Sequence, residues 1–183
     1  MANICSNSTV FYGKREFLDA LWGVIQNAQE REHPMWLGNI FIEAGFPEKE
    51  ISDGDIYCRG SVDFLSRDER DGSIKIDYQT AWSPIYEEFD KLLNRFFPDV
   101  EEVTIAEECG CEIFINTDVE GRWFKDRYQI EREDSDTEYF DDLDSFLRRF
   151  NEIFGTSFGT FAECEAYEPA DDSWVSVHEY ADR

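Results

Sequence analysis

Residues 4–13 read ICSNSTVFYG, and residues 14–28 continue as KREFLDALWGVIQNA. The first stretch is rich in Thr, Val, Phe and Tyr and ends at Gly13, which predicts a β-strand over residues 4–12. In the second stretch apolar residues recur every three or four positions, which predicts a helix that ends at His33-Pro34. The apolar stripe consists of Phe17, Leu18, Leu21, Trp22, Ile25 and Ala28.

The elements that follow complete a regular order. Residues 56–66 and 73–81 predict two strands joined by a hairpin that ends in Asp-Gly. Ser83 is a good helix N-cap and Pro84 suits the first helical position, so a helix is expected from there to Pro98. Residues 100–108 and 112–117 predict strands around a Cys109-Gly110-Cys111 turn with half-buried thiols. The order strand, helix, strand, strand, helix, strand predicts an α+β split βαβ sandwich, an antiparallel sheet with helices on one face.

The remaining segments show less regular patterns. Residues 35–54 mix Gly, Pro and acidic residues and are expected to be irregular. Trp82 is expected to lie in the core, at the entry to the second helix. Residues 122–132 and 174–177 predict further strands. Ser135 and Glu138 have capping-box spacing, which predicts a third helix that Gly155 ends. Its apolar stripe is Phe140, Leu143, Leu147, Phe150 and Phe154.

Three sequence blocks resemble the YubB/Api92-like ferredoxin-like proteins of phages and plasmids. They are CSNSTVFYG at residues 5–13, TAWSP at 80–84 with FFP at 96–98, and Glu107-Glu108 running into Gly110. The family usually has two prolines after the serine, whereas this chain has Pro84-Ile85. The resemblance spans about residues 1–118 and implies a ferredoxin-like domain there and a mobile-element origin, but no catalytic residues. Residues 119–183 are then expected to form an acidic C-terminal extension packed on that domain.

The charge balance is strongly acidic. Seventeen Lys and Arg stand against 42 Asp and Glu, a formal net charge of −25. This balance argues against direct binding to nucleic acid or to anionic membranes, and it favours basic partners. The N-terminus lacks a secretion signal, and five cysteines make an odd number, so reduced thiols and a cytoplasmic location in a bacterial host are expected. The oligomeric state is left open.

The acidic residues are concentrated near residue 140. Residues 101–183 hold 24 acidic and 7 basic residues, and eight of the fourteen residues from 131 to 144 are acidic. The dipole of a helix start favours one or two carboxylates, so eight exceed that need. The predicted partner-binding residues are Glu131, Glu133, Asp134, Asp136, Glu138, Asp141, Asp142 and Asp144, and Glu107, Glu108, Asp171 and Asp172 are expected to extend the surface.

Two interpretations of these carboxylates remain. In the first they keep a phage or plasmid accessory protein soluble, since charge runs are usually solvated faces. In the second they substitute for the phosphates of DNA and block the basic groove of a nucleic-acid-binding protein, such as a CRISPR effector complex, as an anti-CRISPR-like inhibitor would.

An enzyme or a metal protein is the less favoured class. A calcium loop starting at Asp134 fails, because Tyr139 and Ser145 stand at its sixth and twelfth positions. One residue separates Cys109 from Cys111 in the sequence, whereas two to four residues usually separate paired zinc ligands. Neither Cys58 nor Cys164, the possible further ligands, lies in a paired motif. We therefore expect no catalytic residues, metal or cofactor, with a small-ligand or metal-binding module as the alternative.

Overall fold

The chain divides into two units, and its fold is α+β. The computed structural model describes residues 3–133, 135–170 and 173–182. The N-terminal unit comprises Met1–Ile113 and the C-terminal unit Phe114–Arg183. The boundary falls inside strand β5 (Ile113–Asn116).

The N-terminal unit is built on an antiparallel sheet. Its strands are β1 (Ile4–Gly13), β2 (Gly60–Arg67), β3 (Ile74–Ala81) and β4 (Val100–Glu108), and the strand order is β2-β3-β1-β4-β5. Strand β1 pairs antiparallel with β3 and with β4, and β2 pairs antiparallel with β3. This arrangement is consistent with a ferredoxin-like α+β fold.

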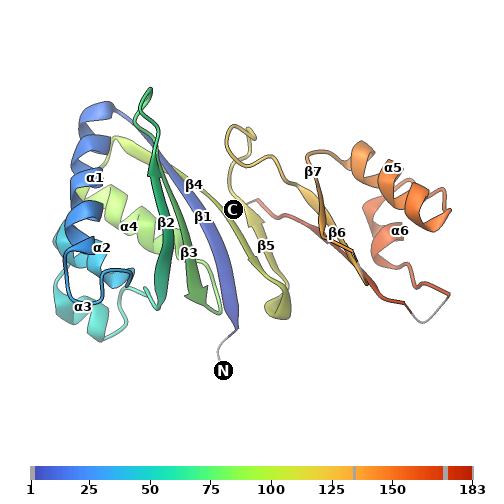
Figure 1. The fold of residues 1–183 in the computed structure, drawn as a ribbon, viewed down its shortest axis with the longest axis horizontal. Helices are drawn as coiled ribbons and strands as arrows, with labels where there is room; N and C mark the ends of the chain where they lie inside the picture. Colours follow the sequence, from blue (N-terminus) through green and yellow to red (C-terminus); the bar gives the residue numbers. More distant parts are fainter. Residues whose placement is uncertain (1–2, 134, 171–172, 183) are drawn as a thin grey trace. The chain divides into compact units, whose positions relative to one another are not determined.

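Helices of this unit cover one face of the sheet (Figure 1). They are α1 (Arg15–Gln29), α2 (Gly38–Ala44), α3 (Glu48–Ser52) and α4 (Tyr86–Phe96). The interior between helices and sheet contains Phe11, Tyr78 and Phe89, and the ring of Phe89 meets the other two edge-on, with centroids 5.1 and 5.7 Å away. The central helices and strands predicted from the sequence are therefore present.

The prediction of irregular structure over residues 35–54 was wrong. This segment contains α2 and α3, and Gly45, with φ of 112°, separates them in a left-handed conformation. Helices of seven and five residues are too short to show an apolar period. Leu37, Ile40 and Phe41 are buried in the core, which explains the apolar residues of this segment.

The entry to α4 also differs from the prediction. The helix begins at Tyr86, with Ile85 as N-cap, rather than at Pro84. Trp82 adopts a left-handed conformation (φ 74°), and its backbone N–H donates to the carbonyl of Asn3. Its side chain is 46% exposed, so the expectation that Trp82 lies in the core was wrong.

The C-terminal unit has a smaller sheet and an aromatic core. Strands β6 (Tyr128–Arg132), β7 (Glu138–Phe140) and β8 (Val175–Glu179) are arranged in the order β7-β6-β8. Helices α5 (Leu143–Phe154) and α6 (Phe161–Glu165) pack on this sheet. The buried residues of this core are Ile130, Phe146, Phe150, Cys164 and Val177.

Two expectations for this unit were wrong, and one helix was not expected. The helix predicted from Ser135 begins at Leu143, because Glu138 and Phe140 belong to β7. The strand predicted over residues 122–132 covers Tyr128–Arg132 alone, because the buried carboxylate of Asp118 holds the preceding loop by accepting from the N–H groups of Trp123 (2.6 Å) and Phe124 (2.9 Å). Helix α6 was missed, although Thr160 and Glu163 form a capping box.

None of the five cysteines, all of which lie in the described residues, forms a disulfide. Cys5, Cys58 and Cys164 are buried, and burial raises the pKa of each thiol to about 11. Cys109 and Cys111 lie in a 3₁₀ turn, but both are exposed rather than half-buried. Within the described part of the chain, no helix is long and apolar enough to cross a membrane.

Candidate acidic binding surface

The predicted acidic residues lie on several elements of the C-terminal unit. Glu131 is in β6 and Glu138 in β7, whereas Glu133 and Asp136 lie in the connection between these strands. Asp141 and Asp142 precede α5, and Asp144 is in its first turn. Asp134 lies outside the described residues, as do Asp171 and Asp172. The carboxylates therefore form two groups, one at each end of β7, and not one helical stripe.

Glu138 has a structural role between these two groups. Its carboxylate accepts from Arg149 Nε at 2.6 Å and from Arg132 Nη2 at 2.8 Å. The hydrogen bond from Arg149 is the main cause that lowers the pKa of Glu138, and Arg132 adds to it. Because two cations compensate this half-buried carboxylate, Glu138 offers little charge to a partner.

Asp142 is positioned by the start of α5. Its carboxylate accepts from the backbone N–H of Ser145 at 2.7 Å, and this bond is the main cause that lowers the pKa of Asp142. An aspartate at an N-cap satisfies a helix N–H that has no intrahelical partner. The helix thus fixes an exposed, ionised carboxylate, with exposed Asp141 and Asp144 next to it in the chain.

Asp141 and Asp142 border a hollow of about 280 Å³ in this unit. The chain end supplies two more carboxylates to its lining, Glu179 and Asp182. Long-range pairing brings them there, because Glu179 pairs with Tyr128 across β8 and β6, and Ala181 forms a bridge with Ile115. Neither Glu179 nor Asp182 was identified in the sequence analysis. No local sequence pattern predicts that Glu179 pairs with Tyr128, because the two residues are 51 positions apart.

Ionisable groups close to the hollow interact with its carboxylates. Burial, and next the charge of Asp141, raises the pKa of Asp126. The hydroxyl of Tyr128 donates to Glu179 Oε1 at 3.0 Å. Arg127 also lines the hollow, but its guanidinium donates to the backbone carbonyls of Asn116 and Asp118. Its position is therefore fixed by the preceding loop.

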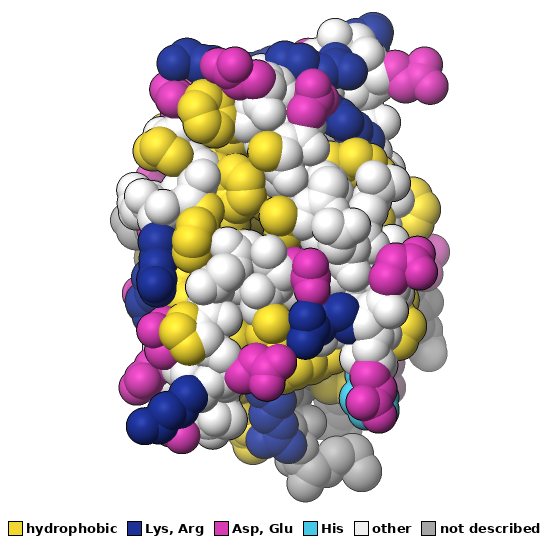
Figure 2. All heavy atoms as spheres, turned by 90° about the vertical axis from the view of Figure 1, so that its left-hand side faces the viewer, with side chains coloured by type: hydrophobic (Ala, Val, Ile, Leu, Met, Phe, Trp, Pro, Cys, Tyr) yellow, Lys and Arg dark blue, Asp and Glu magenta, His cyan; other side chains and the backbone are white. Residues whose placement is uncertain are grey.

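The N-terminal unit distributes its charges differently. Figure 2 shows the side that carries the helices of this unit, where Lys and Arg side chains are interspersed with Asp and Glu side chains. Of the acidic residues expected to extend the surface, Glu107 is half-buried, and Glu108 is buried and accepts from the backbone N–H of Gly110 at 3.2 Å. The expectation that Glu108 extends an acidic surface was wrong, because it caps the 3₁₀ turn.

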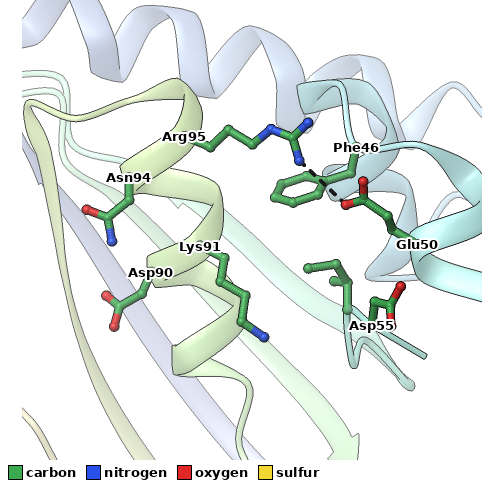
Figure 3. A pocket seen from close by; sticks show the side chains of 8 residues that line it. Phe46, Glu50, Asp55, Asp90, Lys91, Asn94 and Arg95 are labelled. Atoms are coloured by element: carbon green, nitrogen blue, oxygen red, sulfur yellow. Dashed lines mark hydrogen bonds and ion pairs between the residues drawn. The ribbon is translucent and has the colours of Figure 1, made fainter. Parts of the chain in front are cut away.

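A larger groove, of about 740 Å³, lies in the N-terminal unit between α4 and the segment around α3 (Figure 3). Lys91 and Arg95 point from α4 towards Glu50 and Asp55, and Arg95 Nη1 lies 3.5 Å from Glu50 Oε2. The guanidinium of Arg95 also lies over the Phe46 ring, 4.8 Å from its centroid. Three carboxylates and two cations line this groove, whereas four carboxylates and one guanidinium line the hollow in the C-terminal unit, so the charge of the groove is more evenly balanced.

The described residues contain no group of three or more His, Cys, Asp or Glu side chains placed to hold a metal ion. Cys109 and Cys111 are exposed, whereas Cys58 and Cys164 are buried in separate cores. These thiols are therefore not assembled as the zinc alternative requires.

No known protein family and no curated protein sequence matches the chain.

Proposed function

We propose that this chain is a non-enzymatic, acidic interaction protein of phage or mobile-element origin, with a ferredoxin-like split βαβ fold in its N-terminal unit, that acts in the cytosol of a bacterial host. It inhibits a nucleic-acid-binding defence complex, such as a CRISPR effector, by occupying the basic groove that DNA would fill. The observation that carries this proposal is the hollow bordered by the carboxylates of Asp141, Asp142, Glu179 and Asp182.

The electrostatic argument starts from the DNA that the protein would replace. Duplex DNA presents one negative charge per ~1.7 Å of its axis, so a mimic must hold many carboxylates on a folded surface. Here Glu133 and Asp136 are exposed on the connection before β7, and Asp141, Asp142 and Asp144 are exposed after it. Three strand residues rise about 10 Å, so β7 keeps the two groups apart at a fixed spacing.

The rigidity of the support distinguishes this surface from an acidic tail. Glu138, between the two groups, is held by Arg132 and Arg149, and Asp142 is held by the first turn of α5. Helix α5 is itself anchored by Phe146 and Phe150, which are fully buried. Carboxylates that are already ordered lose less conformational entropy on binding than carboxylates of a disordered segment.

The first experiment measures competition with DNA. A labelled DNA duplex is bound to purified CRISPR effector complexes, and its fluorescence anisotropy is followed as the full-length protein is added. We expect displacement at 0.1 M salt and much weaker displacement at 1 M, because the Debye length falls from ~10 Å to ~3 Å. A protein that leaves DNA bound in every complex, at either salt concentration, contradicts inhibition of such complexes.

The second experiment tests the surface itself. A variant with Glu133→Gln, Asp136→Asn, Asp141→Asn, Asp142→Asn and Asp144→Asn removes five charges, and asparagine remains a good N-cap at position 142. The matched control removes five charges from the N-terminal unit, with Glu48→Gln, Glu50→Gln, Asp53→Asn, Asp55→Asn and Asp90→Asn. We expect loss of displacement in the first variant alone. Equal losses in both variants would show that net charge matters and the surface does not.

A further inference from the structure

One face of the sheet in the N-terminal unit carries none of that unit's helices (Figure 1). Side chains alternate between the faces of a strand, and Phe11 of β1 points to the helix-covered face, where it meets Phe89. The even-numbered residues of β1 therefore point to the other face. Along β1 these are Ile4, Ser6 and Ser8, which pair with Ala81, Gln79 and Asp77 of β3.

Two large apolar side chains are exposed at this end of the uncovered face. Ile4 is 59% exposed and Phe64 is 56% exposed. Phe64 pairs with Asp77, directly after an irregularity in the pairing of β2 between Val62 and Phe64. Bulges of this kind re-aim side chains at the edge of a sheet. The two apolar side chains thus belong to β1 and to the edge strand, with β3 between them.

A hollow of about 270 Å³ lies on the same face. Strands β2, β3 and β4 contribute the carboxylates of Asp63, Asp77 and Glu107 to its lining, and none of the described residues that line it is a lysine or an arginine. Ser8 Oγ donates to Asp77 Oδ1 at 2.5 Å, and Lys75 Nζ lies 3.1 Å from the same atom. The remaining polar lining comes from Ser6, Asn7, Ser8 and Gln79.

The carboxylates of this hollow and the exposed apolar side chains near it together favour an arginine of a partner protein. Several carboxylate and hydroxyl oxygens within one small hollow match the planar fork of a guanidinium better than the single ammonium of lysine. The aliphatic stem of an arginine also packs on apolar side chains while its head is bound. Exposed Phe64 and Ile4 offer such contacts, and they suit apolar neighbours of the arginine in the partner's sequence.

We propose that this end of the uncovered sheet face binds an arginine-containing segment of a partner protein, with the guanidinium among Asp63, Asp77 and Glu107 and apolar residues against Phe64 and Ile4. This surface belongs to the N-terminal unit, so the proposal does not depend on DNA mimicry by the C-terminal unit. A partner can be recognised here without being a nucleic-acid-binding protein.

The test maps binding of a defined probe on the ¹⁵N-labelled full-length protein. The probe is the peptide acetyl-Leu-Arg-Leu-Arg-amide, and the control peptide has citrulline in place of arginine, which keeps the shape and removes the charge. We expect saturable amide shifts at residues 4–8, 60–66, 77–81 and 105–107 with the arginine peptide alone. Shifts confined to residues 131–144 and 179–182, or equal shifts with citrulline, would overturn the proposal.

Variants separate this site from general attraction to an acidic protein. The combination Asp63→Asn with Glu107→Gln should weaken peptide binding about tenfold, because charge-assisted hydrogen bonds are lost. The control combination Glu50→Gln with Asp55→Asn removes the same charge elsewhere in the unit and should leave binding unchanged. Phe64→Ser should weaken binding without a change in charge. Retained binding in the first variant would overturn the proposal, whereas the five-charge variant of the C-terminal unit should bind the peptide normally.

Discussion

The two units use their charged residues in opposite ways. In residues 1–113, ten Lys and Arg accompany 23 acidic residues, and nine of those ten cations lie within 4.0 Å of a carboxylate. In residues 114–183, seven basic residues accompany 19 acidic ones. There Arg132 and Arg149 both pair with one carboxylate, Glu138, and Arg127 binds backbone carbonyls.

The hydrophobic cores of the two units also differ, both in size and in how deeply their residues are buried. Leu18, Leu21 and Ile25 of α1 are buried in a large interior of the N-terminal unit, together with residues of four strands and three other helices. The core cluster of the C-terminal unit has five buried residues, and the ten further apolar residues packed against it are partly exposed. The smaller unit therefore carries the denser negative charge on the smaller core. Repulsion between its carboxylates must be offset by a few well-placed contacts, and these contacts are where substitutions should have the largest effects.

The largest effect is expected in the aromatic core. Phe150→Ala removes a fully buried ring and should lower the free energy of unfolding of the C-terminal unit by about 3–5 kcal/mol. Hydrogen exchange read by mass spectrometry should then rise in peptides from residues 128–180 and stay unchanged in residues 4–108. The matched variant Phe89→Ala should produce the reverse pattern. Increased exchange in both units with either variant would break the comparison, since it would show a single cooperative core.

The second effect concerns the loop before β6. Asp118 is 2% exposed and accepts from two backbone N–H groups. Asp118→Ala leaves these donors without their acceptor and should cost about 2–3 kcal/mol. Asp118→Asn retains one acceptor oxygen and should cost less. Urea unfolding measures both values, and equal, small losses would show that the carboxylate does not organise this loop.

Local sequence signals predicted the N-terminal unit better than the C-terminal unit. The period of Leu18, Leu21 and Ile25 and the Pro98 stop placed α1 and the end of α4, because these helices are long enough for a pattern to appear. The C-terminal unit depends on pairing at a distance. Ser135 and Glu138 satisfy a capping box in spacing, but Arg149, eleven residues further on, holds Glu138 in a strand instead. Glu179 and Asp182 reach the candidate site through β8, which no local pattern could place.

The third effect sharpens the role of Glu138. Glu138→Gln removes a carboxylate that two guanidinium groups share, and it should cost about 1–2 kcal/mol. Glu152→Gln is the matched control, because Glu152 lies 3.8 Å from Arg149 and is 59% exposed. Exposed pairs contribute about 0–1 kcal/mol, so this variant should be nearly neutral. The unfolding temperatures of the two variants give the comparison. If Glu152→Gln is as destabilising as Glu138→Gln, the pairing of Arg149 with Glu138 has no special structural role.

The smallest effect is the pH dependence of the helix cap. The backbone N–H of Ser145 lowers the pKa of Asp142 from its ordinary value of 3.8, so its contribution to stability is present above pH 4 and is lost as the pH falls through the lower, folded-state pKa. Asparagine caps a helix without titrating, so Asp142→Asn provides the reference. The urea midpoint of the parent minus that of this variant should be constant from pH 7 to pH 5 and should fall below pH 4. Titration of every other group is common to both proteins and cancels in this difference. A difference that stays constant down to pH 2 would mean that the carboxylate of Asp142 is not the acceptor that holds α5. The position of the acidic surface would then depend on the aromatic core alone.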